Sequence, residues 1–191
     1  MKCALFAFVI FIAGNVSAQS VERTAEWITF TPANKSFSIK MPTEPKVESE
    51  DLGGDAGDIK ATYYTAEGED VFIVLAVMYD LPMKADRLNE QEAGNIFESF
   101  RKGFAEGFQN SFAESGLTVD VKFGEKVKTT AAGLSGIDQD VSIGMFSART
   151  RILFAKDEVF MFFVFPLPGA DEGTAEKLLN TFTFNGKQAA R

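Results

Sequence analysis

The sequence contains no histidine. This absence excludes the Ser-His-Asp triad, the Cys-His pair and every metal site that needs an imidazole ligand. Beyond the amino-terminal segment, chemistry is left to carboxylates, lysines, arginines, tyrosines and hydroxyls. We therefore expect no catalytic residue, no metal site and no bound cofactor, and we interpret the protein as a non-enzyme.

Cysteine is nearly absent as well, because Cys3 is the single one. One cysteine forms no internal disulfide, so stability must come from the burial of apolar side chains. Twenty phenylalanines supply large side chains for this burial. Cys3 precedes the first apolar run, whereas the cysteine of a lipid anchor follows it, and we expect no lipid anchor.

Basic residues are outnumbered by acidic ones, 19 to 27, which gives a net charge of −8. An acidic surface repels both the phosphate backbone of nucleic acids and anionic lipid headgroups. We therefore expect neither nucleic acid nor an anionic membrane surface as a partner.

The first apolar run, Ala4 to Ala13, is too short to span a membrane comfortably. It follows a basic start and precedes the small residues Val16-Ser17-Ala18. This arrangement is typical of a secretory signal peptide over residues 1–18, with cleavage near Ala18-Gln19. We expect a secreted or periplasmic protein with no transmembrane segment in the mature chain; an uncleaved anchor is the alternative.

Two later runs, Val71 to Met78 and Val159 to Phe165, are apolar throughout. A strand with one wet face alternates apolar and polar residues, so these two predict central strands that are covered on both faces. Phe37 to Met41 does alternate and predicts a strand with one buried face. We interpret the three tyrosines as residues of strand ends with wet hydroxyls, with a stacking platform as the alternative: Tyr63, Tyr64 and Tyr79.

Two amphipathic segments predict the helices, Asp86 to Ser115 and roughly Ala170 to Thr181. The first places one apolar face within an arc of about 120°. That face consists of Ala93, Phe97, Phe100, Phe104, Phe108 and Phe112. The second has an apolar stripe of Ala175, Leu178, Leu179 and Phe182. We interpret Gly103 and Gly107, at the edge of the first face, as positions that let the helix approach the sheet closely.

The positions of aromatic residues and prolines resemble the opening of bacterial secreted proteins with the PsbP-like fold. These positions are Trp27, Phe30, Phe37 to Pro42 and Pro45. The superfamily also includes a nuclear Ran-binding family and the periplasmic DcrB-type proteins. The later order is similar too, with a strand pair, one long helix, a glycine-punctuated meander and a closing helix before a Phe-Thr-Phe.

The resemblance covers nearly the whole mature chain. It implies an α+β fold: a mostly antiparallel sheet with helices on both faces, an α/β/α sandwich used in that superfamily mainly for binding and accessory roles. It brings no catalytic residues with it. We therefore expect a signal peptide over 1–18, a flexible leader over 19–26, a single PsbP-like domain over 27–185 and a frayed tail over 186–191, in a monomer.

Lys46 to Asp58 combines three glycines with five acidic residues. The acids do not have the spacing of an EF-hand loop, which needs a glutamate at its twelfth position. We therefore predict a solvated hairpin turn here. A weak calcium site between Glu48 and Asp58 is the alternative that stays open.

Ile137 to Met145 alternates, which places Asp138 and Asp140 on one face about 7 Å apart. Two carboxylates at such a distance suit inverting glycoside hydrolysis. A turn at Met145-Phe146 would instead pair Asp140 with Arg151 and Ser142 with Arg149. We favour the resulting charge ladder, because arginines keep carboxylates ionised, and ionised carboxylates are no general acids.

Arg149 and Arg151 also suggest a small anion or partner site, together with Asp138 and Asp140. For the whole protein we favour a non-catalytic binding or accessory module whose partner is a protein or an envelope component. A carrier that holds a small apolar ligand between the phenylalanine face and the sheet is one alternative. A hydrolase that uses carboxylates only is the other.

Overall fold

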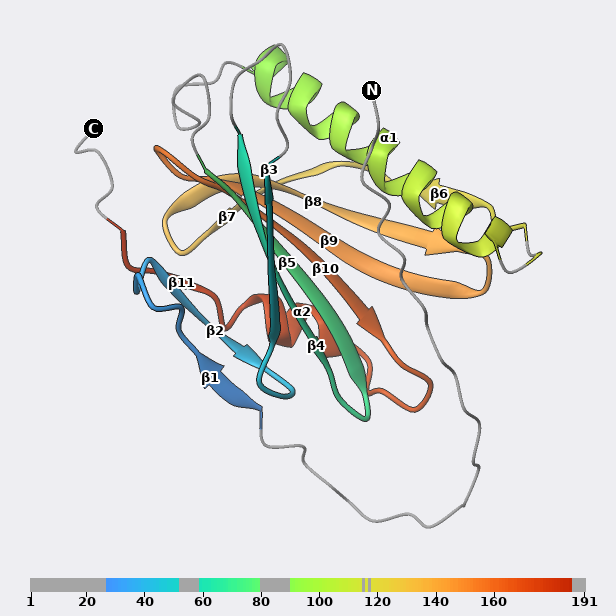
Figure 1. The fold of residues 1–191 in the computed structure, drawn as a ribbon, viewed down its shortest axis with the longest axis horizontal. Coiled ribbons are helices and arrows are strands. Elements are labelled where there is room, and N and C mark those ends of the chain that lie inside the picture. The colour runs from blue at the N-terminus through green and yellow to red at the C-terminus, as the bar shows by residue number, and fades with distance from the viewer. Residues whose placement is uncertain (1–26, 52–58, 80–89, 115, 117, 187–191) are drawn as a thin grey trace.

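The computed structural model describes residues 27–51, 59–79, 90–114, 116 and 118–186 (Figure 1). The predicted signal peptide and leader, and the end of the predicted tail from residue 187, lie outside the described residues.

The described residues form two sheets and two helices, and every described strand pair is antiparallel. The large sheet runs in the order β3 (Lys46–Asp51), β4 (Lys60–Glu67), β5 (Val71–Tyr79), β10 (Val159–Pro166), β9 (Phe146–Phe154), β8 (Leu134–Ile143) and β6 (Val121–Phe123), with β7 (Val127–Ala131) also paired to β8. The small sheet runs in the order β1 (Ile28–Phe30), β2 (Phe37–Met41) and β11 (Thr183–Phe184). The helices are α1 (Glu90–Glu114) and α2 (Thr174–Leu179).

The prediction that Val159 to Phe165 is a central strand is confirmed, because β10 lies between β5 and β9. Successive residues of a strand point to opposite faces, so an unbroken apolar run needs cover on both. Phe160 and Phe162 lie in one core cluster with Leu178 of α2, whereas Val159 and Met161 lie in a second cluster with Phe97 of α1. β10 therefore joins two cores on opposite faces of the large sheet.

The expectation of helices on both faces is corrected. One face carries α1, but the other carries the small sheet together with α2, which is only six residues long (Figure 1). The predicted second helix from 170 to 181 is shortened because Gly169 and Gly173 have left-handed backbone angles, with φ of 96° and 78°. The fold remains mostly antiparallel α+β.

The interpretation of Gly103 and Gly107 is wrong. A Cβ atom added at either position would meet nothing within 4 Å, so neither glycine brings α1 close to another element. The large rings of α1 fill the gap instead: Phe104 stacks on Phe163 of β10, with ring centroids 4.1 Å apart. Close packing does require a glycine at Gly136 of β8, where a Cβ would collide with the backbone carbonyl of Ile152.

The predicted hairpin turn over Lys46 to Asp58 is wrong in its first half, because Lys46–Asp51 forms the edge strand β3. The sequence pattern did not indicate this strand, because its residues are mostly charged and neither of its faces is apolar. Charged residues are common on sheet edges. The calcium alternative extends to residues 52–58, which lie outside the described residues.

The glycine contacts predict opposite effects of alanine at two positions. Gly103→Ala should raise the free energy of unfolding by about 0.5–1 kcal/mol, because alanine loses less backbone entropy in a helix and meets no neighbour. Gly136→Ala should lower it by roughly 1–3 kcal/mol through overpacking between β8 and β9. Urea titrations of both variants measure the difference; destabilisation by Gly103→Ala would show that α1 lies closer to the sheet than described.

Candidate functional site

The β8–β9 hairpin turns one residue earlier than predicted, which moves each cross-strand partner by two residues. Its last pair is Ile143 with Phe146, so Gly144-Met145 forms the loop, and Gly144 has a φ of 59°. Two-residue hairpin loops favour glycine at such a position. Asp138 consequently pairs with Arg151, and Asp140 with Arg149. A shift of two residues preserves the face of each side chain, so the predicted ladder forms with different partners.

Arg151 is the centre of this ladder and is only 3% exposed. Its Nε and Nη2 each donate to one carboxylate oxygen of Asp138, at 2.8 Å. Its Nη2 also donates to Glu176 at 3.0 Å, and its Nη1 to the side-chain oxygen of Asn180 at 3.1 Å. Burial alone would lower the pKa of Arg151, but the hydrogen bond and charge of Asp138 outweigh it, and the pKa is raised.

Arg149 lies nearer the surface and extends the same network. Its Nη1 donates to Asp140 at 2.8 Å, and its side chain lies 3.6 Å from a carboxylate oxygen of Asp138 and 3.7 Å from one of Glu176. Burial acts to lower its pKa, but the hydrogen bond and charge of Asp140, together with the charges of Asp138 and Glu176, outweigh it, and the pKa is raised. Glu176 and Asn180 come from α2 and its end. We call Asp138, Asp140, Arg149, Arg151, Glu176 and Asn180 the arginine network.

The arginine network is arranged to hold α2 on the sheet. Hydrolysis by Asp138 or Asp140 would require a free carboxylate in a cleft, and each is instead bound by a guanidinium. The anion-site interpretation is not supported either, since both guanidiniums already contact protein carboxylates. Sequence reasoning missed Glu176 and Asn180, because no local pattern links α2 to a hairpin some 25 residues earlier.

On the apolar face of α1, Phe97, Phe104 and Phe108 contact the sheet directly. Phe97 is buried against Ile152 and Met161, and Phe108 stacks on Phe165 with ring centroids 5.8 Å apart. Arg101 lies over the ring of Phe123, 4.4 Å from its centroid, at the edge of the interface. At these contacts, aromatic rings occupy the space that an apolar ligand would need.

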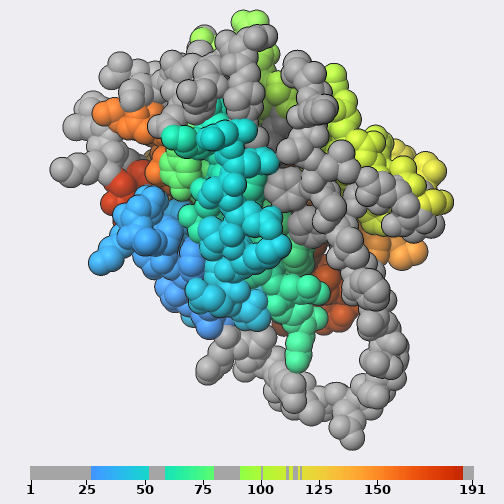
Figure 2. Space-filling view, in the orientation of Figure 1, coloured from blue at the N-terminus to red at the C-terminus, as the bar shows by residue number. Residues whose placement is uncertain are grey.

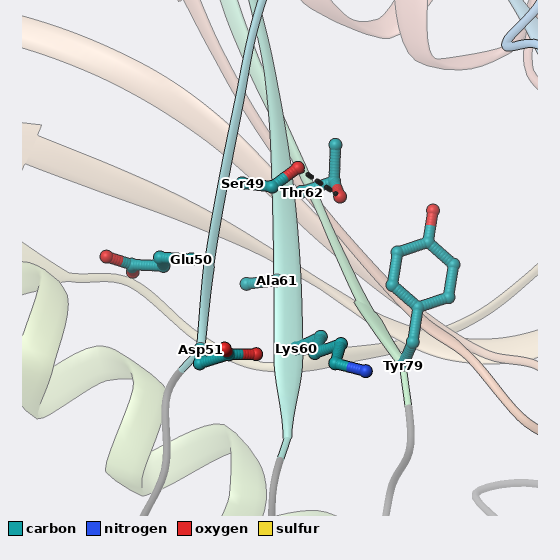
Figure 3. Close-up of a pocket in the computed structure, with 7 residues that line it drawn as sticks. All are labelled: Ser49, Glu50, Asp51, Lys60, Ala61, Thr62 and Tyr79. Carbon is teal, nitrogen blue, oxygen red and sulfur yellow. Dashed lines mark hydrogen bonds between the residues drawn. The ribbon is translucent and has the colours of Figure 1, made fainter.

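A different part of the large sheet carries an open hollow of about 380 Å³ (Figure 3). Its lining residues come from β3, β4 and β5: Ser49, Glu50, Asp51, Lys60, Ala61, Thr62 and Tyr79. Asp51, Lys60 and Tyr79 lie side by side across the three strands, and the hydroxyls of Ser49 and Thr62 are hydrogen-bonded at 2.9 Å. We call this feature the β3 hollow.

Glu50 points away from Ser49 and Asp51, to the opposite face of β3 (Figure 3). Its carboxylate accepts a hydrogen bond of 2.7 Å from the Tyr63 hydroxyl. Tyr79 faces the β3 hollow, and burial first, then Tyr64 and the charge of Glu158, raise the pKa of its hydroxyl. Tyr79 therefore stays neutral and places an aromatic ring next to Lys60, which separates it from Asp51. The sequence alone did not reveal this site, because it depends on the alignment of three strands.

β3 forms the rim of the hollow and one edge of the large sheet. Five of its six residues are exposed, among them Val47 with 52% of its surface. In the space-filling view, this part of the chain lies on the face turned to the viewer (Figure 2). No strand among the described residues pairs with the outer side of β3.

Within the parts of the chain that the structure describes, no three Cys, Asp or Glu side chains gather as metal ligands would. Neither described helix has the length and apolarity needed to cross a bilayer.

No protein-family model and no curated protein matches the sequence. Among solved structures, the protein is similar to the solution structure of cyanobacterial PsbP (CyanoP) from Synechocystis sp. PCC 6803. The TM-score is 0.51 at 9% sequence identity, and the match covers 90% of this chain and 99% of that one. The likeness at this identity concerns the fold alone: the protein has a PsbP-like fold, as the resemblance predicted.

Substitutions of the two aspartates in the arginine network should lower the free energy of unfolding by unequal amounts. Asp138→Asn should lower the free energy of unfolding by roughly 3–5 kcal/mol, because it leaves the buried Arg151 without its bidentate partner. Asp140→Asn should cost at most about 1 kcal/mol, because Asp140 is exposed. Thermal and urea unfolding compare the two variants.

The double variant Asp138→Leu with Arg151→Met is the control, because it removes both charges of the pair. It should recover much of the stability lost in Asp138→Asn. Equal, small costs at the two aspartates would contradict a buried network.

Proposed function

We propose that the protein is a secreted or periplasmic binding module without catalysis, and that its partner docks at β3 and the β3 hollow. The observation that carries this proposal is the free edge strand beside an open polar hollow. The PsbP-like fold supports it, since the resemblance implies binding and accessory roles. The partner is a protein or an envelope component.

The contrast between the two polar sites supports the same choice. In the arginine network, the charged groups bind one another, and Asp138 and Arg151 are buried, so they have little left for a partner. In the β3 hollow, Ser49, Asp51 and Lys60 are exposed side chains that a partner can reach. Hot spots of interfaces also tend to centre on aromatic residues, and Tyr79 is in place for that role.

A crosslinking experiment tests the docking surface. A photoreactive benzoylphenylalanine replaces Ser49, at the rim of the hollow, in the full-length protein expressed in its own host. We expect one reproducible adduct after irradiation of intact cells. The matched control carries the same group at Lys122 on β6, an exposed position at the opposite edge of the sheet.

Adducts at Ser49 alone support the proposal. Equal adducts at both positions indicate nonspecific contacts, and adducts at Lys122 alone place the partner at the other edge. Both of those results, and the absence of any adduct, overturn docking at the β3 hollow.

The proposed location rests on the signal peptide, which has its own test. We expect the protein isolated from the cell envelope or the medium to begin at Gln19, because Val16-Ser17-Ala18 forms the small-x-small exit. Intact-mass spectrometry measures this directly. A mass that retains residues 1–18 would indicate an uncleaved anchor.

A further inference from the structure

The outer side of β3 presents backbone donors and acceptors that no described strand uses. The strand pairs with β4 without interruption, from Lys46 opposite Thr65 to Asp51 opposite Lys60. It contains neither a proline nor a bulge, the usual devices that block the addition of another strand. At the opposite edge of the sheet, the border is divided between the short strands β6 and β7.

The charged side chains of β3 are the remaining feature that can prevent another strand from pairing with it. They discourage strands of one charge and favour strands of the other. The strand carries Lys46 against Glu48, Glu50 and Asp51. These acids repel acidic strands and attract basic ones. The ion pair between Lys46 and Glu48 is exposed on both sides, so it is weak and gives way to a better partner.

We propose that β3 binds an extended, basic segment of a protein partner as an additional antiparallel strand of the large sheet. The proposal rests on the proposed function and adds the mode of binding and the chemistry of the partner. Main-chain hydrogen bonds would supply affinity, and side chains at alternate positions would supply specificity.

The two faces of β3 define the sequence of that segment. Glu48 and Glu50 share the face of Tyr63, so the segment carries lysine or arginine opposite both. Val47 lies on the other face and is half exposed, so an aliphatic β-branched residue fits opposite it.

The β3 hollow lies on the same face of the large sheet as Val47. It receives one more side chain of the partner segment. Asp51 faces the hollow from β3, and Lys60 of β4 lies between it and Tyr79. The exposed carboxylate of Asp51 favours a lysine or arginine opposite it on the added strand. The partner strand opposite Asp51 to Lys46 then reads Lys-Arg-Thr-Lys-Val-Thr.

Peptide binding tests the sequence preference. The probe is the fluorescently labelled hexapeptide Lys-Arg-Thr-Lys-Val-Thr with blocked ends, titrated with the full purified protein and followed by anisotropy. Glu48→Lys with Asp51→Lys should weaken its binding about tenfold or more. The control variant Asp171→Lys with Glu172→Lys makes the same change in net charge at two exposed residues before α2, and should leave the Kd within about twofold.

An acidic peptide, Glu-Glu-Thr-Glu-Val-Thr, provides the reciprocal test. It should bind the Glu48→Lys, Asp51→Lys variant more tightly than the unchanged protein. This gain of binding cannot come from misfolding of the variant. Equal losses in the two double variants would overturn the proposal, since net charge alone would then explain the binding.

N-methylation of the peptide distinguishes strand addition from simple charge attraction. In a strand, alternate N–H groups point to opposite edges, so one set of methylated amides blocks pairing with β3 and the other set faces away. We expect one methylated peptide to lose binding and the other to retain it. Equal binding of both overturns strand addition.

Two outcomes separate this inference from the proposed function. If the adduct at Ser49 identifies a partner while neither methylated nor unmethylated basic peptides bind, docking at the β3 hollow stands and the basic strand is wrong. If sedimentation shows a dimer without peptide, and Glu48→Lys with Asp51→Lys dissociates it, a second copy of the chain occupies β3 and the inference is overturned.

Discussion

The structure depends on the burial of β10 on both faces. Its residues from Val159 to Val164 are buried, and none of them has a polar side chain. Such a strand is stable only where cover exists above and below the sheet. α1 supplies cover on one face, and the small sheet with α2 supplies it on the other. Layer order and the position of the helices follow from this requirement.

The same architecture places charged side chains in two different environments. Where α2 covers the sheet, the arginine network lies between them, and its charges are paired because an isolated buried charge is costly. Where no described element covers β3, Glu48 and Asp51 stay exposed to water. The buried charges hold the fold together, and the exposed ones give the free edge its preference for a basic partner.

Individual residues show which features of the fold could be predicted from the sequence and which could not. The apolar run from Val159 to Phe165 predicted a central strand, and the structure confirms that prediction. Gly144 carried the information that would have corrected the hairpin register, since a glycine favours the first position of a two-residue loop. For Gly103 no such information existed, because the distance between a helix and a sheet depends on the rings of both.

The sequence by itself determined the mostly antiparallel class of the fold, the central strands and the absence of imidazole chemistry. These properties depend on residue type and on period along the chain, which are local. Only the tertiary structure decided that Glu176 and Asn180 join Arg151, and that Asp51, Lys60 and Tyr79 meet across three strands. Such contacts arise from the register and stacking of distant segments, and those are set by the packing of the whole core rather than by any one stretch of it.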